Sequence, residues 1–76
     1  MQLLHLYYFK LLAENEHLLN TAKIIHISPP ALSTTISRLE DELQVSLFDR
    51  VGRKIKLNEN GKTFIYPCMQ YLFRTG

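Results

Sequence analysis

The apolar residues near the start of the chain recur at helical spacing in two blocks. Residues 3–14 are apolar around most of the helical circumference, and only three of these positions are polar. A shorter apolar pattern covers residues 18–25, after a three-residue connection. We expect a helix over each block, with Asn15 in the left-handed conformation that turns the chain between them. A helix as apolar as the first is either central or packed against something beyond its own small domain.

The clearest helical pattern covers residues 28–43. Ser28 is a favoured N-cap residue, and Pro29 fits the first turn, where its missing N–H costs nothing. On a period of about 3.6 residues, four apolar side chains fall on one narrow face, and the opposite face is short, hydroxylated and uncharged at its start. Two helices joined by a short turn match a helix-turn-helix, whose second helix reads DNA. Taken alone, however, the stretch fits an ordinary amphipathic helix with a solvated face at least as well.

The pattern then changes from helical spacing to a two-residue alternation. We predict a two-stranded hairpin, or wing, over residues 48–57, with Val51-Gly52-Arg53 as its turn. Two strands alone are only marginally stable, so this hairpin must lean on the helices. The basic residues that it carries are Arg50, Arg53, Lys54 and Lys56.

The last apolar pattern follows Asn58, a favoured N-cap residue, with Glu59 in the first turn, where the helix dipole favours a negative charge. We expect a fourth helix from about residue 59 towards the end of the chain. Pro67 lies inside this pattern and removes one helical hydrogen bond, which predicts a kink near Thr63 or two shorter segments.

Composition and charge narrow the class of protein. A chain of 76 residues forms one small domain, for which help from a partner in burying apolar surface is expected. The net charge of +2 decides nothing, but most of the Lys and Arg side chains lie between residues 46 and 62, a concentration of charge expected of a nucleic-acid binder. The single Cys68 excludes an internal disulfide and fits a reducing compartment, and no apolar run reaches the roughly 18 residues of a membrane span. We therefore expect a cytoplasmic, nucleoid-associated protein without a membrane partner.

Candidate catalytic chemistry is sparse. The histidines and Cys68 do not form a metal-ligand spacing, no glycine-rich phosphate loop is present, and no nucleophile has a visible base. We expect no enzyme, no cofactor and no metal site. A membrane-surface peptide is also disfavoured, because the apolar first and last helices lack a Lys/Arg-rich opposite side.

A set of residues spread over the chain, in order and without a gap, carries a family likeness. They are Leu3-x-x-Leu6-x-x-Phe9, Ala13-Glu14, Ala22, Ser28-x-Pro30-Ala31-Leu32-Ser33, Ile36-x-x-Leu39-Glu40-x-x-Leu43, Leu47-Phe48-x-Arg50, Gly52-Arg53, Leu57 and Gly61. Together they resemble the N-terminal DNA-binding domain of the LysR-type transcriptional regulators. The combined motif is far more specific than any one of its pieces.

The resemblance implies a mainly α fold, a winged helix-turn-helix with a three-helix core, a small two-stranded wing and a C-terminal linker helix. Residues 1–58 would then be the DNA-binding domain and residues 59–76 the start of the linker, the helix that pairs two subunits in that family and sets their recognition helices in successive major grooves. Family members normally continue into a large domain that binds a small-molecule effector. None of that domain is present in residues 1–76, so the chain is an isolated domain, a truncated product or a free-standing relative, and an effector is expected only if such a domain exists.

The reading face departs from the family pattern. Pro29, Thr34 and Thr35 stand where the family commonly has Gln and a basic or amide pair. The direct base contacts must therefore differ from the commonest set, with fewer charged or amide contacts and more weight on the wing and on DNA shape.

Two turns also depart from the family pattern. Gln44 replaces a usual Gly, and Glu16-His17 replaces a usual Gly-Ser, which predicts turns that are strained or shifted. Asn60 replaces a frequent Ala, and this exchange should matter little.

The expected DNA contacts follow from side-chain chemistry within the motif. The hydroxyls of Ser33, Thr34 and Ser37 can reach base edges or phosphate oxygens, and Arg38 reaches a phosphate or pairs with Glu42. The full predicted set is Ser28, Pro29, Pro30, Ser33, Thr34, Ser37, Arg38, Arg50, Arg53 and Lys54.

Within that set, the wing residues have different expected roles. Arg53 at the wing tip is expected in the minor groove, and Lys54 on backbone phosphate. Arg50 either contacts DNA or ties the wing to the recognition helix through Asp41 or Asp49.

The first and last helices carry more apolar residues than so small a domain can cover, which favours a twofold contact between copies of the last helix, flanked by the first. The predicted interface residues are Leu4, Tyr8, Phe64, Ile65, Cys68, Tyr71 and Leu72. We expect a homodimeric transcription regulator module that binds double-stranded DNA sequence-specifically, with residues 28–43 in the major groove and residues 48–57 on the backbone and minor groove. The alternative is a truncated dimerisation module that pairs with a full-length relative and modulates its DNA binding.

Overall fold

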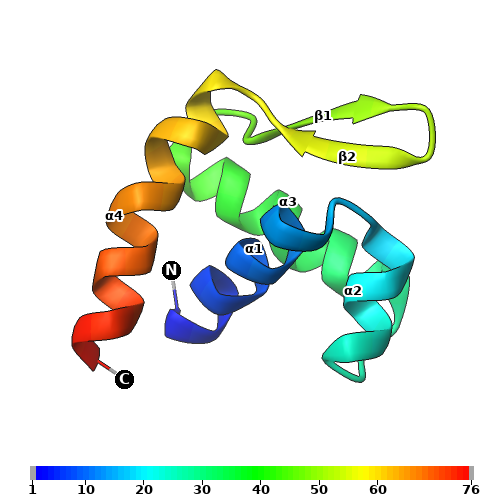
Figure 1. Ribbon diagram of the computed structural model, residues 1–76, viewed down its shortest axis with the longest axis horizontal. Coiled ribbons are helices and arrows are strands. Elements are labelled where there is room, and N and C mark those ends of the chain that lie inside the picture. Colours follow the sequence, from blue (N-terminus) through cyan, green and yellow to red (C-terminus); the bar gives the residue numbers. More distant parts are fainter. Residues whose placement is uncertain (1, 76) are drawn as a thin grey trace.

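The computed structural model describes the backbone of residues 2–75 and the side chains as far as Phe73. Its elements, in chain order, are α1 (Leu3–Asn15), α2 (Leu18–Ile24), α3 (Pro29–Leu43), β1 (Phe48–Val51), β2 (Lys54–Leu57) and α4 (Glu59–Thr75) (Figure 1). The first three helices pack together, the hairpin projects beyond α3, and α4 runs back beside α1 so that its end lies near the start of the chain (Figure 1). This is the predicted mainly α fold with a two-stranded wing.

The core is built around Phe9, which is fully buried in the middle of α1. Its ring lies 5.4 Å from the ring of Phe48 at the root of the wing and 5.3 Å from the ring of Phe64 in α4, measured between centroids. One aromatic side chain therefore joins the helical core to both the wing and α4. The other buried side chains among residues 2–73 are those of Leu6, Leu12, Thr21, Ala22, Leu32, Ile36, Leu39, Leu47 and Cys68.

The start of α3 confirms the predicted N-cap. The Ser28 hydroxyl accepts the Ala31 N–H at 3.3 Å, and Pro29 opens the first turn. Ahead of it, the Ile27 N–H donates to the Ala22 carbonyl at 3.1 Å, which closes the turn between α2 and α3. These local bonds fix α3 against α2 in the helix-turn-helix arrangement.

The left-handed residue after α1 is Glu16 (φ 61°), so its assignment to Asn15 was wrong. Asn15 completes the helix instead, and its side-chain amide donates to the Leu11 carbonyl at 2.9 Å. The Glu16 N–H then donates to the Leu12 carbonyl at 2.8 Å, which is the bond that ends the helix. Gln44 ends α3 in the same conformation (φ 61°), so a residue with a Cβ occupies a left-handed position in both turns where the family usually has Gly.

The wing covers residues 48–57 as predicted, but its turn is Gly52-Arg53 alone, because Val51 is the last residue of β1 and pairs with Lys54. Phe48 pairs with Leu57 and Arg50 with Ile55, and because cross-strand partners share a face, these four lie on the side towards the helices. The outer face carries Asp49, Val51, Lys54 and Lys56, all exposed. The hairpin is tied to the α1–α2 turn as well, because the Ile55 N–H donates to the Glu16 carbonyl at 2.9 Å.

The last helix begins as predicted, with the Asn58 side-chain oxygen accepting the Gly61 N–H at 2.9 Å. It continues as one helix across Pro67, so the alternative of two shorter segments is wrong. Phe64 and Cys68, on either side of that proline, both pack on α1, and this anchoring on two turns holds the helix together where one backbone bond is lost.

Candidate nucleic-acid interface

The polar side of α3 divides into two rows. Pro30, Thr34 and Arg38 lie opposite the buried stripe of Leu32, Ile36 and Leu39 and are exposed. The N-cap Ser28 is also exposed, and Pro29 beside it is half-buried. The predicted reading residues at the tip of α3 are thus open to a ligand.

The second row of α3 turns towards the wing. Ser33 and Glu40 are half-buried there, and Ser37 lies at the exposed edge between the two rows. With Ser46 and Arg50 these side chains line a hollow of about 120 Å³ between α3 and the hairpin, whose floor is apolar. We call it the wing hollow. It brings together three predicted DNA-binding residues, Ser33, Ser37 and Arg50, that come from two different elements.

The basic side chains around α3 and the wing are exposed. Arg53 lies in the tight turn at the wing tip, beside Gly52, whose φ of 63° suits a residue without a Cβ. Lys54 follows on the outer face, and Arg50 lies on the inner face. Within residues 2–73, Arg38, Arg50, Arg53 and Lys54 form no ion pair. The predicted alternative pairs, Arg38 with Glu42 and Arg50 with Asp41 or Asp49, are therefore not among the ion pairs of that part of the chain.

A hydrogen-bond network at the root of the wing was not predicted from the sequence. Glu40 accepts the Leu47 N–H at 2.6 Å and the Ser46 hydroxyl at 3.4 Å through the same carboxylate oxygen. The Ser46 carbonyl in turn accepts the side-chain amides of Asn58 (2.9 Å) and Asn60 (3.2 Å). This network links α3, the wing and the start of α4. Asn60, whose exchange for the usual Ala was expected to matter little, therefore makes a structural hydrogen bond. The sequence feature that could have indicated this network is the position of Glu40 within the family motif.

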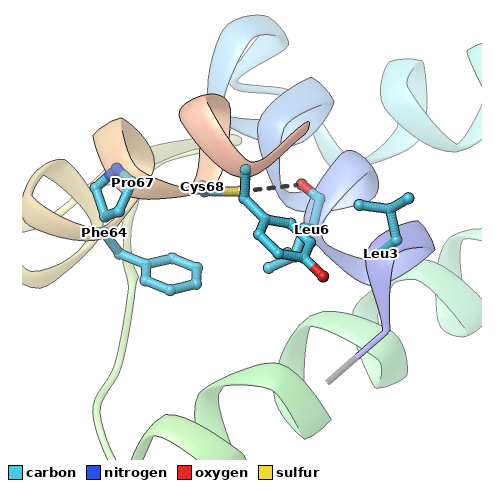
Figure 2. A pocket seen from close by; sticks show the side chains of 6 residues that line it. Leu3, Leu6, Phe64, Pro67 and Cys68 are labelled. Atoms are coloured by element: carbon cyan, nitrogen blue, oxygen red, sulfur yellow. Dashed lines mark hydrogen bonds between the residues drawn. The ribbon is translucent and has the colours of Figure 1, made fainter. Parts of the chain in front are cut away.

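The predicted dimer residues lie along α1 and α4, with different exposure. Leu4 and Tyr71 are exposed, whereas the others except Cys68 are half-buried against the core: Tyr8, Phe64, Ile65 and Leu72. An apolar cavity of about 270 Å³ opens between the two helices, lined by Leu3, Leu6, Phe64, Pro67, Cys68 and Tyr71 (Figure 2).

Cys68 is a core residue and leaves almost no surface for a seam between subunits. Its side chain is 3% exposed, and its Sγ donates weakly to the Leu6 carbonyl at 3.5 Å, from α4 to α1 (Figure 2). Its assignment to the dimer surface was wrong, because α4 turns this face towards α1 of the same protomer. Burial raises the pKa of the thiol from 9.0 to about 11, with Lys10 acting in the opposite direction.

The described residues contain neither a metal-binding cluster nor a membrane-spanning helix. No group of three or more His, Cys, Asp or Glu side chains there could hold a metal ion. None of the helices in that part of the chain combines the length and the apolar character needed to cross a bilayer.

Known proteins match both the sequence and the fold. The chain is 50% identical over 58 residues to the uncharacterised HTH-type transcriptional regulator YybE of Bacillus subtilis (strain 168), an overlap of 76% of this chain and 20% of that protein. It is 42% identical over 72 residues to the HTH-type transcriptional regulator BudR of Klebsiella aerogenes, or 95% of this chain and 50% of that protein. The chain thus spans between a fifth and a half of the length of these two relatives, both of which are transcriptional regulators.

Solved structures with this fold include complexes with DNA. The DNA-binding domain of CbnR in complex with DNA superposes with a TM-score of 0.94 at 32% identity, over 100% of this chain and 87% of that one. The DNA-binding domain of BenM in complex with benA site 1 DNA gives a TM-score of 0.92 at 32% identity, over 99% and 87%. Residues 3–62 match the sequence model of a protein family that is described as "Bacterial regulatory helix-turn-helix protein, lysR family". With that match over most of its length, the chain belongs to the lysR family of bacterial regulatory helix-turn-helix proteins.

Proposed function

We propose that this chain is the DNA-binding module of a transcription regulator, with α3 in the major groove and the wing along the backbone and minor groove. The observation that carries the proposal is the set of exposed basic side chains without ion pairs among the described residues, Arg38, Arg50, Arg53 and Lys54, on either side of the open tip of α3. The wing tip and the start of α3 lie at the same end of the molecule, away from α4 (Figure 1). A duplex can therefore meet both elements at once.

The neutral tip of α3 sets the kind of recognition. Thr34 offers a hydroxyl to base edges and a methyl group to thymine, and Pro30 offers apolar contact to thymine methyls or sugar. Neither forms the bidentate contacts that Arg, Asn or Gln make to purines. Arg53 supplies a charge for a narrow minor groove, while Arg38 and Lys54 supply charge for phosphates, so specificity rests more on DNA shape and on the wing.

Assembly as a homodimer completes the proposed function. Leu4 and Tyr71 expose apolar surface on α1 and α4, beside the half-buried Tyr8 and Leu72. A twofold contact along α4 would cover these side chains, together with Phe64 and Ile65, and would place two copies of α3 on successive major grooves. Such a module acts on the nucleoid in the cytoplasm. A small-molecule effector enters only through a further domain of a longer protein.

Titration of duplex DNA at several salt concentrations tests the proposal. We expect affinity to fall steeply with salt, and Arg53→Ala to reduce the slope of log affinity against log salt by about one per protomer, because the variant lacks one cation that releases counterions from the duplex. Lys10→Ala, which removes a charge on α1 that pairs with Glu14, is the matched control and should leave the slope unchanged. Absent or salt-independent binding, combined with tight association to a longer relative, would contradict the proposal and favour the dimerisation module.

A further inference from the structure

The wing hollow holds a specific arrangement of donors. Arg50 enters it from the inner face of β1, while Ser33 and Ser37 line it from α3. Neither serine hydroxyl forms a hydrogen bond within residues 2–73, and Arg50 forms no ion pair there. A guanidinium and two hydroxyls thus converge on one space without a hydrogen-bond or ion-pair partner among the described residues. Guanidinium groups favour phosphate oxygens, because their paired N–H donors match two oxygens of one phosphate.

We propose that Arg50, Ser33 and Ser37 bind one backbone phosphodiester of DNA in the wing hollow, bridging α3 and the wing. The proposal rests on the proposed function and changes the role of Ser33 within it. Because Ser33 faces the wing and is half-buried, it lies off the row of Pro30 and Thr34 that faces outward. Ser33 therefore sets the register of the protein on the backbone, and the outward row reads the bases.

Glu40 decides which anion fits. It lines the same hollow, and its carboxylate is held at the root of β1 by the Leu47 N–H and the Ser46 hydroxyl. These bonds offset part of its charge, but a carboxylate next to the site still disfavours a second negative charge. The hollow therefore suits a phosphodiester, which carries one charge, better than inorganic phosphate, which carries up to two near neutral pH.

Salt titrations of charge-matched variants on a short mixed-sequence duplex test the assignment. Arg50→Gln should lower the slope of log affinity against log salt by about one per protomer and weaken binding about tenfold or more at low salt. Lys56→Gln removes the same charge from the outer face of the same wing, opposite Asp49, and should leave the slope near that of the wild type. Arg50→Lys should keep the slope and lose affinity, because the charge remains and the paired donors are gone. Circular dichroism and the urea midpoint report whether each variant is folded.

Ser33 separates a phosphate contact from base reading. Ser33→Ala should weaken binding about tenfold or more on every duplex, as expected for the loss of one hydrogen bond to a charged group, without changing the sequences recovered from a random-duplex selection. Combined with Arg50→Gln, its effect should shrink, because both groups hold the same phosphate. Inorganic phosphate at constant ionic strength should not compete.

Several outcomes would overturn the assignment. Equal loss of slope in Arg50→Gln and Lys56→Gln would mean that Arg50 acts only through general electrostatics. A changed base preference in Ser33→Ala would return Ser33 to base reading, and competition by inorganic phosphate would make the hollow a general anion site. A wild-type chain without salt-dependent DNA binding would instead refute the proposed function itself, so the two failures are distinguishable.

Discussion

Removal of the Glu40 carboxylate tests whether one side chain holds the wing to the recognition helix. Its oxygen accepts the Leu47 N–H at 2.6 Å, and Leu47 is fully buried. A hydrogen bond to a charged group is worth about 1.5–3 kcal/mol, and an unpaired buried donor costs about 1–3 kcal/mol. Because Glu40 is only half-buried, water replaces part of the bond, and we expect Glu40→Ala to lower the free energy of unfolding by about 2 kcal/mol. Glu40→Gln keeps a neutral acceptor in place and should lose about half as much.

Urea unfolding measures this change as a lower midpoint at an unchanged m-value, which indicates lost stability without a change in the surface exposed. All variants are compared at one protein concentration, because dimerisation would make the midpoint depend on concentration. Asp41→Ala is the matched control. Its carboxylate is the neighbouring one on α3, is exposed and has no hydrogen bond or ion pair within residues 2–73, so its loss should change stability by less than about 0.5 kcal/mol. Equal losses in Glu40→Ala and Asp41→Ala would refute the assigned role.

Two further predictions concern the left-handed turn and the buried thiol. Glu16→Gly should raise the free energy of unfolding by about 0.5–1 kcal/mol, because relief of the backbone strain at φ 61° exceeds the added entropy of the unfolded chain. Glu16→Ala keeps a Cβ at this position and should give no gain. Urea unfolding midpoints measure both variants, and an equal gain in the two would contradict the assigned strain. The pKa of the Cys68 thiol is raised from 9.0 to about 11 in the folded protein, so the unfolded chain releases the thiol proton at a lower pH than the folded chain does. The free energy of unfolding therefore keeps the contribution of the protonated thiol below pH 9 and loses it as the pH rises towards about 11. Cys68→Ala should flatten that loss, measured by urea unfolding across the range, and an unchanged pH dependence would speak against a buried thiol.

The local part of the fold was predictable from the sequence, because its determinants lie close together along the chain. The period of the apolar residues located all four helices. Ser28 and Asn58 marked helix starts because a cap bonds to an N–H only three residues away. The change to two-residue alternation, with Gly52 between the two runs, defined the wing. The local errors were shifts of one residue: the left-handed residue after α1 is Glu16 instead of Asn15, and Val51 ends β1 instead of entering the turn.

Side-chain placement on α4 and at the wing depended on contacts between distant segments. Cys68 lies on the same apolar stripe as Phe64 and Leu72, and the stripe alone does not say which member faces α1 of its own protomer. That was decided by the packing of α4 on Leu6, a residue 62 positions away. Likewise, Asn60 meets the Ser46 carbonyl only because the wing folds back between them.

The sequence by itself determined the elements, the caps and the family, and with them the presence of a reading helix beside a basic wing. The tertiary structure decided which side chains share a site. Arg50 and Lys54 are both basic residues of one hairpin, yet the register and the packing of Phe48 on Phe9 turn Arg50 inward to Ser33 and leave Lys54 outside. The physical reason is that a side chain's face follows from its own strand or helix, whereas the surface opposite that face is set by the packing of elements far apart in the chain.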